Sequence, residues 1–120
     1  MLAVGEHVFG EVPGAVLRAA NGFRGGVGSS RQEMCGALSG GVMVLGLMHG
    51  RESAAQDDQA AAEVVRRWRE TFLAHFRYTQ CEPIYRLVRE PAGPGTCAVV
   101  AGEAAGLLVR LIEGESASMI

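Results

Sequence analysis

The chain has 120 residues, of which 48% are hydrophobic and 20% charged, a balance typical of a soluble globule and not of a disordered or fibrous chain. This length suits one hydrophobic core, so we expect a single domain over residues 1–120. The formal net charge of -2, from 11 basic and 13 acidic residues, offers no positive field for a phosphate backbone or an anionic membrane. Nucleic acids and membranes are therefore not expected partners.

The first residues, MLAVGEHVFGEV, lack the basic start of a secretory signal, and Glu6 interrupts their apolar run. The longest uncharged stretch, residues 34–48, is shorter than the roughly 20 residues that span a bilayer. We therefore expect a cytoplasmic protein. In a reducing cytoplasm, an odd set of three cysteines suits thiol chemistry or metal ligation better than structural disulfides.

The first third of the chain predicts a short helix followed by a glycine-rich loop. Pro13 suits the first turn of a helix, which Asn21 and Gly22 would end. Residues 22–30, GFRGGVGSS, contain too much glycine for a helix interior. Their backbone can reach positive φ or approach another group closely, so Gly25 and Gly26 are candidate binding positions.

A central helix is predicted from near Arg31 to Gly50. Ser30 and Glu33 have the spacing of a capping box at its start, and the following residues are apolar on every side, as is typical of a helix buried all round. Gly36 and Gly40 lie one turn apart and each lowers helix propensity. We expect another backbone or a bound group to approach these two glycines closely.

Three further helices are predicted in the second half. The longest should lie between residues 53 and 76, with an apolar stripe formed by Ala61, Val65, Trp68, Phe72 and Phe76. A short helix should follow Cys81, with Pro83 in its first turn. Thr96 suits the N-cap of the last helix, whose stripe comprises Val100, Ala104, Leu107 and Leu111 and whose tail should fray from Gly114.

No alternating strand pattern of useful length is present. The sequence therefore predicts an all-α fold, a compact bundle of about five helices around a glycine-rich buried central helix.

The three cysteines, Cys35, Cys81 and Cys97, each fall near a predicted helix start. The positive end of a helix favours thiolate over thiol, and thiolate is the form that attacks disulfides and binds metals. The alternative is that they are inert and pack as small apolar residues. No C-x-x-C pair is present, so neither a thioredoxin-type motif nor a zinc ribbon is indicated.

Residues 22–50, GFRGGVGSSRQEMCGALSGGVMVLGLMHG, resemble the core signature of the C_GCAxxG_C_C family of redox-active proteins, in its C-G-A-x-x-G form. FLAHFRYTQC places Cys81 where the family has its third cysteine, and TCAVVAGEAAGLL places Cys97 at the fourth. The resemblance implies an all-helical domain whose cysteines serve redox or metal chemistry. It also implies a [2Fe-2S] cluster, which is usually held by four cysteine thiolates.

The family's first cysteine lies in an N-terminal helix shortly before a stretch like LAVGEHVFGEVP, and the sequence given begins at Met1 without it. Either the true start lies upstream, or this member has lost a ligand. Three cysteines complete a four-thiolate site only if two chains pool their thiols or another residue, such as His49, supplies a nitrogen. The missing helix would also expose apolar surface around Leu2, Val4 and Val8. A homodimer partner would cover that surface.

Two functions follow from the sequence. In the first, the protein is a redox or metal-binding module with Cys35 as the principal thiolate. Cys81 and Cys97 are then resolving thiols or fellow ligands, and Gly25, Gly26, Gly36 and Gly40 give a bound group close access. In the second, the protein is a non-catalytic helical module that dimerises or docks to another redox protein. A small-molecule pocket along the glycine ridge is a third hypothesis, and the sequence leaves open whether the protein is an enzyme.

Overall fold

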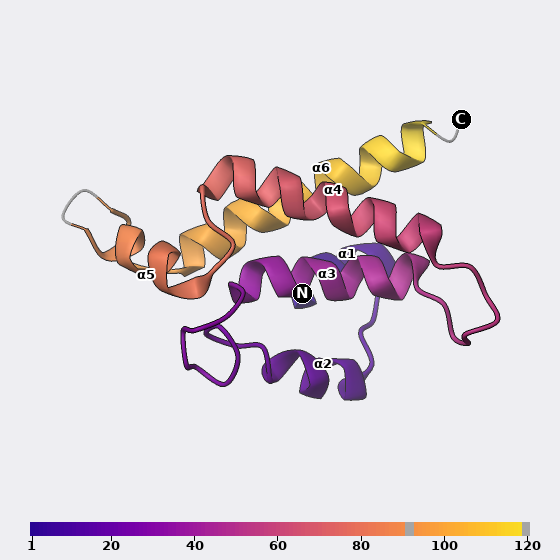
Figure 1. Cartoon of the computed structure of the whole chain (residues 1–120), viewed down its shortest axis with the longest axis horizontal. Coiled ribbons are helices and arrows are strands. Elements are labelled where there is room, and N and C mark those ends of the chain that lie inside the picture. Colours follow the sequence, from indigo (N-terminus) through magenta and orange to yellow (C-terminus); the bar gives the residue numbers. More distant parts are fainter. Residues whose placement is uncertain (91–92, 119–120) are drawn as a thin grey trace.

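The fold is a bundle of helices arranged around one central helix. The computed structural model describes residues 1–90 and 93–118. Within these residues the helices are α1 (Leu2–Phe9), α2 (Gly14–Asn21), α3 (Gly36–His49), α4 (Gln59–Phe76), α5 (Cys81–Arg89) and α6 (Ala98–Ser118) (Figure 1). The only strand-like pairing in this part of the chain is an isolated antiparallel bridge between Met34 and Gln80. The predicted all-α class is confirmed.

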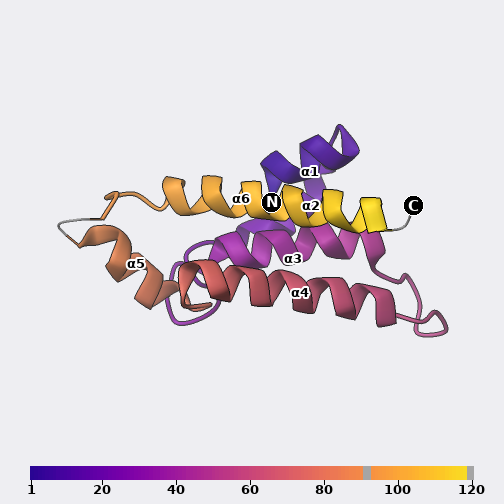
Figure 2. The same cartoon turned by 90° about the horizontal axis from the view of Figure 1, so that it is seen from above.

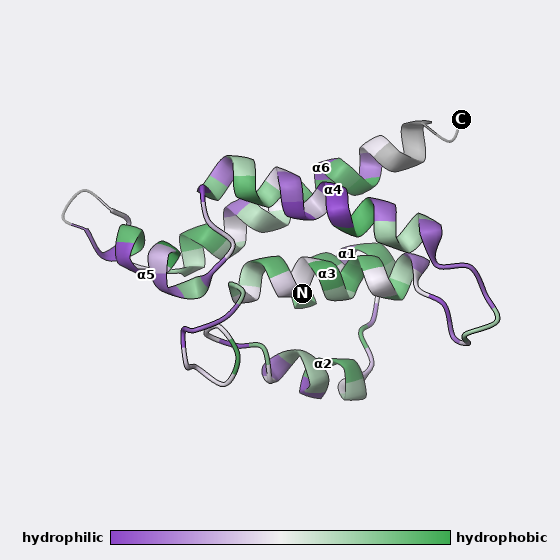
Figure 3. Ribbon diagram, in the orientation of Figure 1, coloured by the Kyte–Doolittle hydropathy of each residue, from purple (hydrophilic) through white to green (hydrophobic). Residues whose placement is uncertain are grey.

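The central helix is α3, which packs against α1, α4 and α6 (Figures 1 and 2). Its buried residues are Leu38, Ser39, Gly40, Gly41, Val44 and Leu45. The residues that α4 and α6 bury in the same core are Val64, Trp68 and Phe72, and Val100, Ala104 and Leu108. Figure 3 shows that α4 alternates between hydrophilic and hydrophobic positions. The prediction of a glycine-rich buried central helix is confirmed. Among the described helices, none combines the length and apolar character needed to cross a membrane.

Two glycines of α3 let neighbouring elements approach its backbone. A Cβ at Gly40 would lie 2.9 Å from the backbone nitrogen of Met1, and a Cβ at Gly41 would overlap the indole of Trp68. Trp68 is fully buried, and its Nε1–H donates a hydrogen bond of 3.0 Å to the carbonyl oxygen of Leu38. The predicted close approach at Gly40 is therefore present, and it serves packing between helices.

The N-terminal segment differs from its prediction. Leu2, Val4 and Val8 were expected to be exposed, yet Val4 is only 4% exposed and Val8 is partly buried against the core. The reason is that residues 2–9 form α1, which folds back onto α3 and α6. Leu2 alone is exposed as expected, at 44%.

Two helix boundaries and the ranking of the helices by length also differ from the prediction. The central helix begins at Gly36 and not near Arg31, because the hydroxyl of Ser30 donates to the carbonyl of Gly26 (2.8 Å) and accepts from the amide of Gln32 (3.2 Å), so no capping box forms. The longest helix is α6, with 21 residues against 18 in α4. α6 also continues past Gly114, where fraying was expected.

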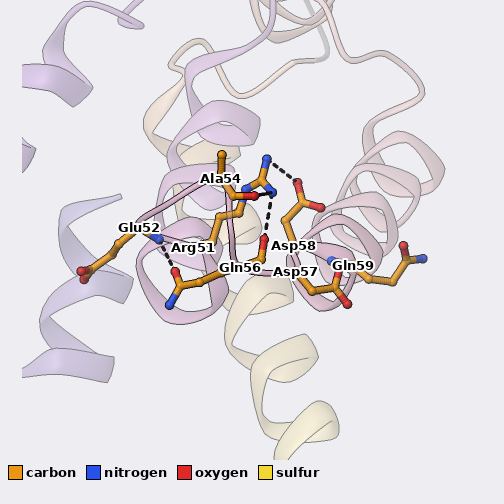
Figure 4. Close-up of polar contacts among 7 residues, drawn as sticks. All are labelled: Arg51, Glu52, Ala54, Gln56, Asp57, Asp58 and Gln59. Carbon is orange, nitrogen blue, oxygen red and sulfur yellow. Dashed lines mark hydrogen bonds and ion pairs between the residues drawn. The ribbon is translucent and has the colours of Figure 1, made fainter.

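α4 begins later than predicted because residues 50–58 form a closed loop (Figure 4). The guanidinium of Arg51 donates to the carbonyl oxygens of Gln56 (2.9 Å) and Ala54 (3.4 Å) and pairs with Asp58 at 3.7 Å. The Asp57 carboxylate accepts a hydrogen bond of 3.0 Å from the amide of Gln59, the first residue of α4. These polar contacts order a connection at the end of α3 that lies opposite Cys35.

Candidate functional site

A short backbone ladder brings Cys35 and Cys81 together. The amide of Cys35 donates to the carbonyl of Thr79, and the amide of Cys81 donates to the carbonyl of Glu33, both at 2.8 Å. Residues two apart on a strand share a face, so the two cysteines are diagonal neighbours on one face of the ladder. Diagonal neighbours are about 7–8 Å apart in a regular ladder. At this separation, a disulfide between them requires movement of the backbone.

Each cysteine lies at the N-terminus of a helix, as predicted. Cys35 is the N-cap of α3, Cys81 is the first residue of α5, and Cys97 directly precedes α6. The hydroxyl of Thr96 accepts a hydrogen bond of 3.2 Å from the amide of Ala98, the first residue of α6. The N-cap position itself is Cys97, one residue after the predicted Thr96, because α6 begins at Ala98 and the carbonyl of Cys97 accepts its first helical hydrogen bond.

The three cysteines line one cavity of about 170 Å³. Its lining residues come from the glycine loop and from the starts of α3, α5 and α6: Gly25, Cys35, Gly36, Ala37, Cys81, Ile84, Tyr85, Cys97, Val100 and Ala101. All three cysteines are free thiols, with Cys35 buried, Cys81 partly buried and Cys97 exposed. The cavity therefore contains every thiol of the chain, at three depths from solvent.

The predicted binding glycines divide into three groups. Gly25 and Gly36 line the cavity. Gly26 packs against Cys81, one of the cavity residues, because a Cβ at this position would lie 2.6 Å from Cβ of Cys81. Gly40 packs against Met1 and does not line the cavity.

The glycine loop has an unusual backbone conformation. Five successive residues have φ between 58° and 70°: Gly25, Gly26, Val27, Gly28 and Ser29. A β-branched residue such as Val27 is rarely found in this left-handed region, so the loop stores strain. Backbone hydrogen bonds of 2.8 Å from Ser29 to Arg24 and from Arg31 to Gly25 hold it closed. This strained conformation places Gly25 at the cavity and Gly26 against Cys81.

Burial raises the pKa of both inner thiols. For Cys35, desolvation is the largest effect, and the amides of Ala37 and Leu38 at the start of α3 lower the pKa by less. Desolvation is again first for Cys81, followed by the charges of the other two cysteines, while Arg31 acts in the opposite direction. The expected stabilisation of thiolate at a helix start is thus outweighed by burial at these two residues. Both thiols should be protonated at neutral pH.

We expect the raised pKa of Cys35 and Cys81 to make the protein less stable in alkali. A thiol whose pKa is higher in the folded than in the unfolded state stabilises the fold fully below the unfolded value of about 8.5. This contribution is lost as the pH rises through the folded pKa. The 11 basic residues are all arginine, so no lysine titrates in this range.

The measurement is thermal unfolding across the alkaline range, beside the ultraviolet absorbance of thiolate. The melting temperature should fall as the pH rises above the ordinary thiol pKa. The Cys35→Ala/Cys81→Ala variant, which has no inner thiols, should lose most of this dependence. An identical pH profile in the variant and the parent would contradict the assignment.

An arginine pair lies over a tyrosine at the edge of the cavity. The guanidinium carbon of Arg89 is 3.6 Å from the centre of the Tyr85 ring, and that of Arg31 is 4.3 Å from it. Tyr85 lines the cavity, whereas the two arginines do not. None of Arg31, Tyr85 and Arg89 was predicted to be a site residue, although Cys81, Tyr85 and Arg89 have the i, i+4, i+8 spacing of one helix face.

The donor set does not fit a four-thiolate cluster within one chain, since only three cysteines are present. Among the described residues, no group of three or more histidine, cysteine or acidic side chains is arranged to hold a metal ion. His49 does not complete the set, because it ends α3, about 20 Å along the helix from Cys35. Metal ligation by Cys35, Cys81 and Cys97 stays a prediction.

The fold and the site thus define the class of this protein, which is a small all-α protein with three free thiols in one cavity. The chain matches the family model C_GCAxxG_C_C over residues 1–111, a family described as "Putative redox-active protein". The chain belongs to this family, and the resemblance seen in its sequence is confirmed. No curated protein and no solved structure shows a significant match to it.

Proposed function

We propose that the protein is a thiol–disulfide redox module that transfers two electrons between the cysteines of its cavity and an external acceptor or donor. The observation that supports this is the convergence of Cys35, Cys81 and Cys97, which are far apart in the sequence, on one cavity. The description of the family as redox-active agrees with it. Oxidation would join two of the thiols in a disulfide and pass two electrons and two protons to the acceptor.

The burial of the thiols suggests their roles. An exchange begins with a thiolate that can reach the partner disulfide, and a second thiol then resolves the mixed disulfide. Cys81 and Cys97 are accessible, whereas Cys35 is buried. We therefore assign the first attack to an accessible cysteine and resolution to Cys35. This reverses the order proposed from the sequence, in which Cys35 was the principal thiolate.

The proposed setting is the reducing cytoplasm, where free thiols persist and can cycle. The three unpaired cysteines agree with this setting. A [2Fe-2S] cluster would require ligands from beyond one chain.

Thiol counting tests the proposal. We expect mild oxidation of the metal-free protein to remove two of its three thiols and a reductant to restore them, because a single disulfide forms in the cavity. Peptide mapping would identify the pair. In the Cys35→Ser variant the resolving thiol is absent, so a mixed disulfide with the oxidant should accumulate and add the mass of half the oxidant.

A matched control is Ser39→Ala, which changes a buried hydroxyl of the same helix and leaves every thiol in place. It should oxidise like the parent. Three thiols that resist every mild oxidant would overturn the redox proposal.

One observation favours the second function, a helical module that associates with a second copy of the chain. An exposed apolar groove between α2 and α3 is lined by Ala15, Val16, Ala19, Met43, Gly46 and Leu47, and α2 has no buried residue of its own. Such a module would keep its oligomeric state in Cys35→Ser. Homodimerisation and docking to another redox protein stay predictions from the sequence.

A further inference from the structure

Two arginine side chains at the edge of the thiol cavity have guanidinium N–H groups that make no hydrogen bond to a described residue. Arg31 and Arg89 both lie over the Tyr85 ring and are both exposed. Neither makes an ion pair among the described residues. The acidic residue nearest in sequence to Cys81, Glu82, is paired with Arg86 at 3.0 Å instead. The Arg31–Tyr85–Arg89 cluster therefore has charge available for a ligand.

The cluster is built from two separate segments that both reach Cys81. Tyr85 and Arg89 follow Cys81 by one and two turns of α5, so the three share a face of that helix. Arg31 comes from the end of the glycine loop, and its charge acts on the Cys81 thiol. A guanidinium stacked on an aromatic ring keeps its N–H donors free at its edge, in the geometry that suits a carboxylate.

We propose that the Arg31–Tyr85–Arg89 cluster binds the anionic groups of a small disulfide whose S–S bond enters the cavity and reacts with Cys81. The substrate class is thus a low-molecular-weight disulfide that carries carboxylates. The size of the cavity supports this class. Its volume of about 170 Å³ is below the roughly 300 Å³ at which pockets begin to enclose a drug-sized ligand. The disulfide and its flanking carbons fit inside, and the charged ends stay outside beside the arginines.

This inference rests on the proposed redox function, and its chemistry balances without a metal. The Cys81 thiolate attacks one sulfur of the substrate, the substrate S–S bond breaks, and the first thiolate leaves. The Cys35 thiolate then attacks the Cys81 sulfur and releases the second. Two electrons pass from the protein thiols to the substrate, and the two protons end on the released thiols.

The test compares three disulfide probes on the reduced full chain: dithiodipropionate, which is anionic, bis(2-hydroxyethyl) disulfide, which is neutral, and cystamine, which is cationic. Each rate of protein oxidation is divided by the rate of the same probe with 2-mercaptoethanol, a thiol without other charged groups, which removes the intrinsic reactivity of the probe. We expect the anionic probe to react at least about tenfold faster than the neutral one, and this preference to fall as salt is added.

Arg31→Gln/Arg89→Gln should abolish the preference for the anionic probe over the neutral one. Because the Arg31 charge also lowers the pKa of Cys81, its loss should slow the reaction with all three probes, so the quantity compared is the ratio of their rates. The matched control is Arg24→Gln/Arg69→Gln, which removes the same charge at two exposed arginines outside the cluster. It should keep the preference, which separates local binding from net charge. Because all four positions are exposed, the variants should fold, and circular dichroism verifies this.

The outcomes separate the two proposals. Equal relative rates for all three probes, or a preference that survives Arg31→Gln/Arg89→Gln, would overturn the anion site and leave the redox function in place. A protein whose thiols react with none of the probes would overturn the redox function itself.

Discussion

Replacing Gly26 by alanine is expected to disrupt the thiol site and to lower the stability of the fold. Gly26 has φ 70°, and a Cβ there would lie 2.6 Å from Cβ of Cys81 and 3.0 Å from Cα of Arg31. The left-handed conformation costs about 1–2 kcal/mol for a residue with a Cβ, and overpacking costs about 1–3 kcal/mol more. Because one of the close atoms belongs to the backbone, rotation of a side chain cannot relieve the overlap.

The functional loss should exceed the loss of stability. Relief of the overlap requires Cys81 to move, and a displacement of about 1 Å can slow a positioned reaction on the order of 100-fold. The measurements are the rate of intramolecular disulfide formation and the free energy of unfolding of the Gly26→Ala variant. Both should fall, with the rate affected even under conditions where the variant is fully folded.

Gly28→Ala is the matched control for this prediction. Gly28 has φ 59° in the same loop, but a Cβ there would meet nothing within 4 Å. It should therefore show only the cost of the left-handed conformation, about 1–2 kcal/mol, and a normal rate of disulfide formation. If both variants oxidise at the parent rate, Gly26 does not position Cys81.

The helices were predictable where their signals are local. Pro13 precedes α2, the pattern around Trp68 and Phe72 marks α4, and the hydroxyl of Thr96 accepts a hydrogen bond from the first amide of α6. These features depend on residues a few positions apart. The start of α3 was not predictable in this way, because the spacing of Ser30 and Glu33 imitates a capping box.

What overrides that local signal is a contact between distant segments. Met34 pairs with Gln80, and the loop before it closes on itself in a left-handed conformation. The pairing is non-local, so no window of the sequence contains it. This pairing also explains why α3 begins directly after Cys35, its N-cap residue.

The site shows the same division. The positions of the cysteines at helix starts follow from the sequence, and the family resemblance predicted that the three act at one site. Their common cavity and the unequal burial of the three thiols follow from tertiary packing. The helix dipole at each thiol follows from the sequence, whereas desolvation, which decides the pKa direction of Cys35 and Cys81, follows from tertiary packing. Tyr85 was missed because its arginine neighbours come from two segments.

Replacing Gly41 by alanine is expected to destabilise the core more than any other single added methyl group in α3. A Cβ at Gly41 would overlap the indole of Trp68, which is fully buried and cannot retreat without opening the core. Its movement would also break the hydrogen bond from Nε1 to the carbonyl of Leu38, leaving the buried indole N–H without an acceptor. Overpacking costs about 1–3 kcal/mol and the lost hydrogen bond about 1–3 kcal/mol more.

Gly46→Ala in the same helix should have the opposite effect. A Cβ at Gly46 meets nothing within 4 Å, and alanine is favoured over glycine in a helix by about 1 kcal/mol. Chemical denaturation of the two variants therefore compares one substitution at two positions of α3, with opposite expected signs. Equal stabilisation by both would mean that Trp68 does not pack on Gly41. A loss of stability at Gly41 together with a gain at Gly46 would show that a neighbouring side chain requires glycine at the first position and not at the second.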